Sequence, residues 1–260
     1  MITTYTNYQL ISKDMQKSLD RKAAEPVVAR EVEYYLANIE NVKSVDEFLG
    51  NHRLYAFAMK AFGLEDMIYA KAFMRKALTE GVEDGSSFAN RLQDERYKEF
   101  VSTFNFARDG EATTTFERAR QGTADKYIRQ VLESDVGAED QGVRLALYFE
   151  RKAANIGNPY DILADTALLQ VVRTALSIPE AASGGDIDAQ AAMIESRLDI
   201  SSLKDPEALG RFLKRFASLW DAENNAASDP TLALYAGASA SSGMNVDLLM
   251  SLQRVKLGGS

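Results

Sequence analysis

The stretch VVAREVEYYLANI at residues 27–39 returns further along the chain as RLALYFERKAANI at residues 144–156. Laid on each other without gaps, the two stretches share five identical residues in thirteen, where ordinary composition gives about one. Apolar residues recur in both at the spacing of one helix face. The sequence therefore predicts a duplicated helix. The identical pairs are Ala29/Ala146, Glu33/Glu150, Ala37/Ala154, Asn38/Asn155 and Ile39/Ile156.

The correspondence continues into the next helix of each copy. Ser44 and Asn158 are both N-capping residue types, and an acid follows each three positions later, at Glu47 and Asp161. A cap and an acid at this spacing satisfy two helix amides reciprocally, and Pro159 suits a first helical position. Apolar pairs then follow in register: Phe48/Ile162, Leu49/Leu163, Leu54/Leu168, Ala61/Ala175, Leu64/Ile178, Phe73/Met193, Met74/Ile194, Leu78/Leu198, Tyr97/Leu209, Phe100/Phe212, Val101/Leu213 and Phe104/Phe216.

This agreement predicts an all-α protein made of two similar helical bundles that arose by internal duplication. The first repeat spans residues 27–106 and the second spans residues 144–220. Within the first, Gly63 and Gly81 are expected to end helices, and Asp94 is expected to cap the last one.

Three segments lie outside the repeats. Residues 1–26 form an N-terminal polar segment with weak periodicity. Residues 107–143 are expected to be a linker that contains one short helix at residues 124–133. Residues 221–260 are expected to be a flexible tail, because residues 235–243 are almost wholly Ala, Ser and Gly.

The tail ends in a short amphipathic stretch at residues 245–255. Its apolar stripe needs a covering surface, and the preceding tether allows that surface to be the protein's own bundle or another protein. The stripe is the candidate partner-binding site, and it consists of Leu248, Leu249, Leu252 and Val255.

Composition narrows the functional classes. The 260 residues carry a net charge of −8, and no run of Lys or Arg provides the positive face that nucleic acids need. The absence of cysteine excludes disulfides and thiolate chemistry. No secretory signal and no membrane span are evident, so we expect no membrane insertion and a protein that is cytoplasmic or exported without a signal peptide.

Catalytic and cofactor motifs are not found. His52 is the single histidine and is expected to lie at the surface of a helix start, so no triad or zinc site is predicted. Glu31, Glu33 and Glu40 leave open a paired-carboxylate hydrolase, against the alternative of a solvated helix face. We expect no cofactor and no enzymatic activity.

Several strings resemble an alphaproteobacterial family of unknown function whose genes often lie in flagellar gene clusters. The resemblance spans both copies and implies a flagellum-associated protein without known catalytic residues. The strings occupy residues 31–39, 44–49, 58–67, 87–92, 142–153 and 158–165.

The resemblance implies flagellar proteins as partners and leads to three functional hypotheses. The first is a non-enzymatic structural or accessory protein of the flagellum that acts in motility through protein–protein contacts. The second is a cytoplasmic adaptor or export chaperone for flagellar components. The third, from another class, is a carboxylate-based enzyme. The sequence does not define the oligomeric state.

Overall fold

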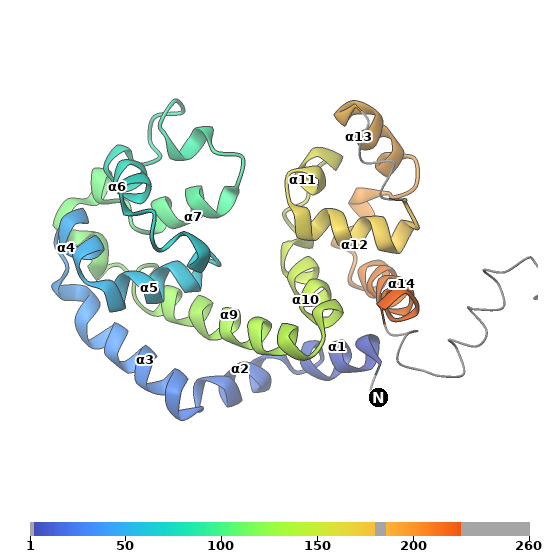
Figure 1. Ribbon diagram of the computed structural model, residues 1–260, viewed down its shortest axis with the longest axis horizontal. Coiled ribbons are helices and arrows are strands. Elements are labelled where there is room, and N and C mark those ends of the chain that lie inside the picture. The colour runs from blue at the N-terminus through green and yellow to red at the C-terminus, as the bar shows by residue number, and fades with distance from the viewer. Residues whose placement is uncertain (1–2, 180–185, 225–260) are drawn as a thin grey trace, which may run out of the picture.

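The computed structural model describes residues 3–179 and 186–224, and every regular element within those ranges is a helix. The predicted all-α class is therefore confirmed for the described residues. Figure 1 shows two groups of helices joined by the long helix α9. The α-helices are α1 (Thr4–Ser12), α2 (Met15–Ala23), α3 (Pro26–Asn38), α4 (Val45–Gly50), α5 (His52–Ala61), α6 (Lys71–Glu80), α7 (Glu95–Thr103), α8 (Phe106–Asp109), α9 (Gln121–Glu139), α10 (Gln141–Ala153), α11 (Pro159–Leu163), α12 (Thr166–Leu176), α13 (Ile187–Glu195) and α14 (Pro206–Asn224).

Short 3₁₀ helices connect several of these elements. They are η1 (Ile39–Asn41), η2 (Glu65–Met67), η3 (Ala89–Arg91), η4 (Gly110–Thr115) and η6 (Ile200–Lys204). None of the helices within the described ranges combines the length and the apolar character that a bilayer crossing requires.

The first lobe is the group of helices α3 to α8 with the N-terminal part of α9, built around one apolar core. Aromatic rings dominate this core. The Phe48 ring lies 4.7 Å from that of Phe104, and Phe100 lies 5.0 Å from Phe104. The buried Tyr35 hydroxyl donates a 2.6 Å hydrogen bond to the Ala119 carbonyl, which ties α3 to the segment before α9.

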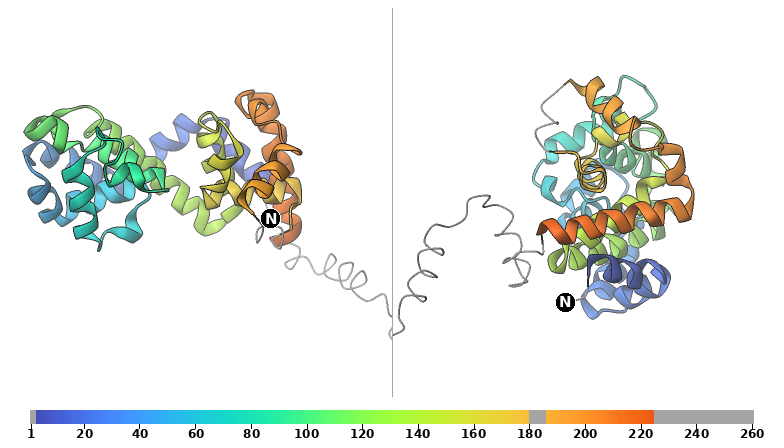
Figure 2. Two further views of the ribbon diagram at one scale, coloured as in Figure 1. Left: turned by 90° about the horizontal axis from the view of Figure 1, so that it is seen from above. Right: turned by 90° about the vertical axis from the view of Figure 1, so that its right-hand side faces the viewer.

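The second lobe is the group α10 to α14 together with α1, and it has its own apolar core. Phe149, Phe216 and Leu168 are buried there, and Tyr8 of α1 belongs to the same core. In Figures 1 and 2 the N-terminal helix α1 lies against α10 and α14. The chain thus begins in the second lobe, passes through α2 to the first, and returns through α9.

The N-terminal segment contains two helices that the weak periodicity did not reveal. Thr3 and Asp14 cap them by accepting hydrogen bonds from backbone amides. Much of the docking of α1 is polar: the Thr4 hydroxyl lies 2.6 Å from an oxygen of Asp221, and Ser12 donates to Glu150 at 2.7 Å. Because such contacts are polar, they do not require apolar residues at helical spacing, and the hydrophobic periodicity of the sequence does not reveal them.

Residues 107–143 differ from the expected linker. The short helix predicted at residues 124–133 is the 19-residue helix α9, and its Tyr127 and Val131 belong to the first core. Before it, η4 packs inward and buries Thr113 and Thr114. Residues 107–131 are therefore an integral part of the first lobe, and the rest of the segment runs on into the second lobe, where Val136 and Val143 pack.

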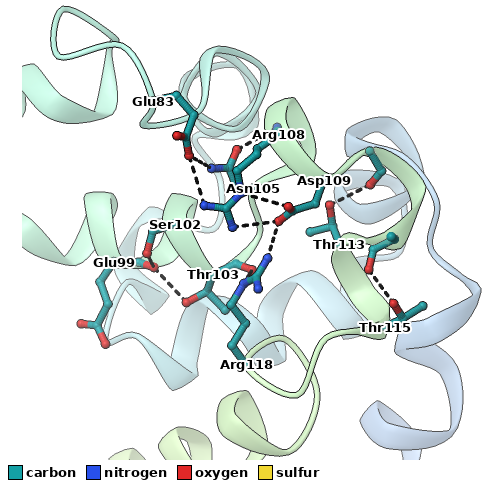
Figure 3. A network of polar contacts seen from close by, with 12 residues as sticks. Glu83, Glu99, Ser102, Thr103, Asn105, Arg108, Asp109, Thr113, Thr115 and Arg118 are labelled. Carbon is teal, nitrogen blue, oxygen red and sulfur yellow. Dashed lines mark hydrogen bonds and ion pairs between the residues drawn. The ribbon is translucent and has the colours of Figure 1, made fainter.

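A polar network explains why a segment rich in charged residues and threonine is held in place (Figure 3). Asp109, only 13% exposed at its side chain, forms ion pairs with Arg108 and Arg118. Arg108 also reaches Glu83 at 3.2 Å, and Glu83 accepts a hydrogen bond from Asn105. The hydrogen bonds from Arg108 hold the pKa of Asp109 below its usual value despite opposition from burial.

The predicted helix boundaries are largely confirmed. Asp94 caps α7, and Gly63 and Gly81 follow α5 and α6 with φ of +67° and +71°. One detail differs between the two predicted capping boxes. The reciprocal capping box forms at Asn158, whereas the Glu47 carboxylate accepts its hydrogen bond from the Lys43 amide, not from the Ser44 amide.

The two lobes share an order of helices and part of a packing pattern, because α4 packs against α5 and α6 as α11 packs against α12 and α13. In sequence order α3, α4, α5, α6 and α7 correspond to α10, α11, α12, α13 and α14. However, α10 also packs against α14, whereas α3 has little contact with α7; both α3 and α10 pack against α9 and against the corresponding helices α5 and α12. The aligned pair Tyr35 and Lys152 also differs, because Tyr35 is fully buried and Lys152 is half-buried.

Candidate functional site

A cleft of about 1190 Å³ lies between the two lobes. Residues of α9 form its floor, α7 and the end of α5 form one wall, and α10 with the start of α12 forms the other. Part of α2 contributes to the floor beside α9. Charged and amide side chains outnumber apolar ones along the lining, but about as much apolar as polar surface is exposed, so the cleft suits a ligand with both kinds of surface.

The first-lobe wall presents Arg96, which is fixed at two points. Its guanidinium donates a 2.7 Å hydrogen bond to the Asp94 carboxylate and also donates to the carbonyl of Gly63, just after α5. Burial opposes the ionisation of Asp94, but the hydrogen bonds from Arg96 outweigh it and lower the pKa of this carboxyl. The same carboxylate caps α7 by accepting a hydrogen bond from the backbone amide of Arg96. The N-terminus of α7 therefore positions the Arg96 guanidinium.

The second-lobe wall presents Tyr148 of α10. Its hydroxyl donates a 2.6 Å hydrogen bond to Asp165, whose other oxygen caps α12. Burial and the hydrogen bond to this carboxylate raise the pKa of Tyr148. The phenol is thus held protonated and oriented by the start of the neighbouring helix.

A buried ion pair joins the floor to the second wall. Glu133 of α9 is only 3% exposed, and Arg151 of α10 contacts both its oxygens at 2.9 and 3.1 Å. The Arg151 guanidinium also lies 5.0 Å from the Tyr148 ring centre. Because a buried carboxylate without its partner is costly, this pair fixes α10 relative to α9.

Charges of the two walls also act on each other across the cleft. After burial and Arg96, the Lys152 ammonium of the opposite wall further lowers the pKa of Asp94. Burial and Asp165 raise the pKa of Tyr148, and the Arg96 charge works against that rise. The pair Asp94 and Arg96 therefore faces Tyr148 and Lys152 closely enough for electrostatic coupling.

Comparison with known proteins places the chain in a family. A family profile described as a protein of unknown function (DUF1217) matches residues 61–209, which is more than half of the chain. The chain belongs to the DUF1217 family. The matched range contains most of the residues that line the cleft, the exceptions being those of α2.

A solved structure resembles the whole chain closely. The X-ray crystal structure of an Agrobacterium tumefaciens protein is 51% identical to this DUF1217 protein, with a TM-score of 0.78. The similarity covers 85% of this chain and 94% of that one. No curated protein matches the chain.

The residues singled out from the sequence of this DUF1217 protein lie away from the cleft or outside the described ranges. The tail stripe of Leu248, Leu249, Leu252 and Val255 lies outside the described residues, so its partner-binding role stays a prediction. His52 is exposed in the first turn of α5, as expected.

The carboxylates singled out on α3 and η1 are separated by their partners. Glu31 pairs with Arg53 at 3.0 Å, and Glu40 pairs with Arg120 at 2.6 Å. Glu33 is exposed. Within the described ranges no three His, Asp or Glu side chains are grouped as metal ligands would be.

Sequence reasoning did not single out the residues of the cleft. One signal was available: Arg144, Tyr148, Arg151 and Asn155 recur at helical spacing along an otherwise apolar helix, so they mark one polar face of α10. Their position opposite Arg96 depends on how the two lobes are set by α9, and no local pattern encodes that arrangement.

Proposed function

We propose that this protein is a non-enzymatic, flagellum-associated accessory protein that acts through protein–protein contacts, with the interlobe cleft as its binding site. The cleft is the observation that carries the proposal. Its volume of about 1190 Å³ lies above the roughly 300–1,000 Å³ of small-molecule pockets, which are also mostly apolar. A polypeptide segment fits both its size and its lining of polar and apolar groups.

The walls have the character of a preorganised binding surface. Arg96 is fixed by Asp94 and Gly63, and Tyr148 is fixed by Asp165. Side chains held before binding lose less conformational freedom when a partner arrives, which favours affinity. Arginine and tyrosine are also enriched at the energetic centres of protein interfaces.

The flagellar part of the proposal rests on the sequence strings shared with a family whose genes accompany flagellar genes. The bacterium that encodes the protein is the place to test it. An in-frame deletion should reduce swimming, and expression of the intact gene should restore it. Normal swimming and normal filament number in the deletion strain would contradict a flagellar role.

A cross-linking experiment tests the binding site. A photoreactive amino acid at Asn155, an exposed cleft position, should cross-link a flagellar component in cells. The same group at Lys204, which is exposed outside the cleft, is the matched control and should not. Equal cross-linking from both positions would argue against the cleft. Fractionation of the adduct into cytoplasm or filament separates an adaptor or chaperone from an exported component.

We also propose that the two lobes descend from a duplicated module. The shared order of five helices and the caps at Ser44 and Asn158 support this origin. The shared packing of α4 on α5 and of α11 on α12 supports it as well, and the contact of α10 with α14, which has no close counterpart between α3 and α7, is then a later divergence. We also keep the proposal that a C-terminal amphipathic helix on a flexible tether is a second contact site for a partner.

A further inference from the structure

The cleft lining combines apolar side chains with charges of both signs. Leu19 and Ala23 of α2 pack beside the first core, and Ala167 of α12 packs beside the second; all three are partly exposed at the lining. Eight carboxylates and six cations also line the cleft, so neither sign of charge is in large excess. An occupant that fits this lining needs an apolar face together with charged groups of both signs.

Some of these charges have no ion-pair partner within the described ranges. Asp20 of α2 and Asp125 of α9 lie on the floor, and each accepts a 2.8 Å hydrogen bond only from the neutral amide of the glutamine four residues earlier. On the second wall, Arg144 and Lys152 of α10 form no salt bridge with any described carboxylate. The floor therefore offers unpaired acids and the wall offers unpaired cations.

The described part of the chain ends close to this cleft. Trp220, in the last turns of α14, packs over Gly142 at the start of α10, and the neighbouring residues Gln141 and Arg144 line the cleft. The end of α14 is thus within roughly 20 Å of the cleft, about two helix diameters. Residues 225–244 follow, and a random coil of that length spans about 25 Å on average. Residues 245–255, the tail segment, are therefore within reach of the cleft.

We propose that, in the free protein, the tail segment of the same chain occupies the cleft as a helix. This inference rests on the proposed function, because it makes the tail segment a competitor of the partner for the same site. The segment lies outside the described residues, and its sequence predicts an amphipathic helix. Its eleven residues would form a helix about 16 Å long, and the stretch of α9 that lines the cleft, from Gln121 to Glu133, is about 18 Å long.

The tail segment carries both kinds of surface that the lining requires. Its apolar stripe consists of Leu248, Leu249, Leu252 and Val255, and the partly exposed apolar side chains of the cleft can remove it from water. Its charges are one acid, Asp247, and one cation, Arg254, with Lys256 directly after it. These charges can pair with the unpaired cations of the wall and the unpaired acids of the floor. A partner that enters the cleft must displace the segment, and the displaced stripe is then free to contact the partner.

The test uses the intact protein, purified without any partner. A photoreactive amino acid at Asn155, which is exposed on the second wall, should cross-link the tail segment within the same chain, as mapped by mass spectrometry. The same group at Lys204, which is exposed outside the cleft, is the matched control and should not. Equal cross-linking of the tail segment from both positions would overturn the inference. Adducts that join two chains would also overturn it, in favour of a second copy.

Two variants of the tail then test the apolar stripe in the Asn155 photoprobe protein. The stripe variant carries Leu248→Ser, Leu249→Ser and Leu252→Ser, and it should lower the yield of the tail cross-link tenfold or more, because apolar burial is lost. The control variant replaces three apolar residues of the opposite helix face, namely Val246→Ser, Met250→Ser and Leu257→Ser, and it should keep the yield. Both variants leave the two described cores unchanged. Equal yields from the two variants would contradict docking through the stripe.

Failure of this inference and failure of the proposed function give different results. If the Asn155 photoprobe cross-links the tail segment in purified protein but captures no flagellar component in cells, tail docking stands and the partner role of the cleft falls. If the photoprobe captures a flagellar component but never the tail segment, the partner role stands and tail docking is wrong. If it captures both, the stripe variant should capture more of the flagellar component than the wild-type chain, because a tethered competitor is removed. Equal capture would refute the competition.

Discussion

Two buried tyrosines of the first lobe allow a sharp test of the structure, because the same substitution should act on them in opposite directions. Tyr35 and Tyr55 are both fully buried in the first core. The Tyr35 hydroxyl donates to the Ala119 carbonyl at 2.6 Å. The Tyr55 hydroxyl is buried with no hydrogen-bond partner among the described residues.

Tyr35→Phe removes the donor and leaves the buried Ala119 carbonyl without it, so the free energy of unfolding should fall by about 1–3 kcal/mol. Tyr55→Phe removes a hydroxyl whose desolvation is not compensated, so stability should stay level or rise by up to about 1 kcal/mol. Urea unfolding followed by circular dichroism compares the two variants within the same lobe. Loss of stability in both variants, or a larger loss in Tyr55→Phe, would show that the hydroxyl environments are misassigned.

The same residues predict an alkaline limit of stability. Burial raises the pKa of Tyr55 to about 12, and burial also raises the pKa of Tyr35. Below the ordinary tyrosine pKa of about 10, both phenols are protonated in the folded and unfolded chains. As the pH rises through 10, only the unfolded chain releases these protons, so stability should fall by at most about 1.4 kcal/mol per pH unit for each group. Each Phe variant should show a shallower decline above pH 10, and identical slopes would refute this account.

Further substitutions test the packing of both lobes. Leu54→Ala and Leu168→Ala should each cost about 2–5 kcal/mol in chemical unfolding, because both side chains are buried, Leu54 in the first core and Leu168 in the second; an effect within error at either site would show that it is not core. Gly142→Ala should cost about 1–3 kcal/mol, since a Cβ there would lie 2.4 Å from the buried Trp220. Gly210→Ala is its control: nothing lies within 4 Å of an added Cβ at this position of α14, so the melting temperature should stay level or rise slightly, and equal losses at the two glycines would contradict the docking of α14 on α10.

The elements that the sequence predicts correctly are those stabilised by interactions between residues close together along the chain. The helix that ends before Gly63 and the helix that begins after Asp94 were found because apolar periodicity, an N-cap or a glycine marks each boundary. Such signals arise from interactions within a few residues along the chain. These signals depend little on the rest of the fold, so they can be recognised in the sequence.

The missed elements depend on distant partners. Residues 107–122 have a composition typical of a linker, yet Asp109 pairs with Arg118, and Thr114 donates to the Val42 carbonyl at 2.8 Å. Likewise α1 gains its position from Asp221, more than two hundred residues away in sequence. The candidate site has the same character, because Arg96 and Tyr148 meet only after two independent cores have formed.

The route of the chain explains how two lobes with separate cores can hold a cleft of fixed shape. α1 belongs to the second lobe, α2 packs along α9, and α9 enters the first core before it reaches α10. Lys22 of α2 pairs with Asp135 of α9 at 2.8 Å, and the buried pair of Glu133 and Arg151 then secures α10. The two segments that connect the lobes, α2 and α9, therefore lie side by side beneath the cleft. Together they resist a bending motion between the lobes that a single connecting helix would allow. The polar N-terminal segment thus positions the walls of the cleft, although it lies outside the range matched by the family profile.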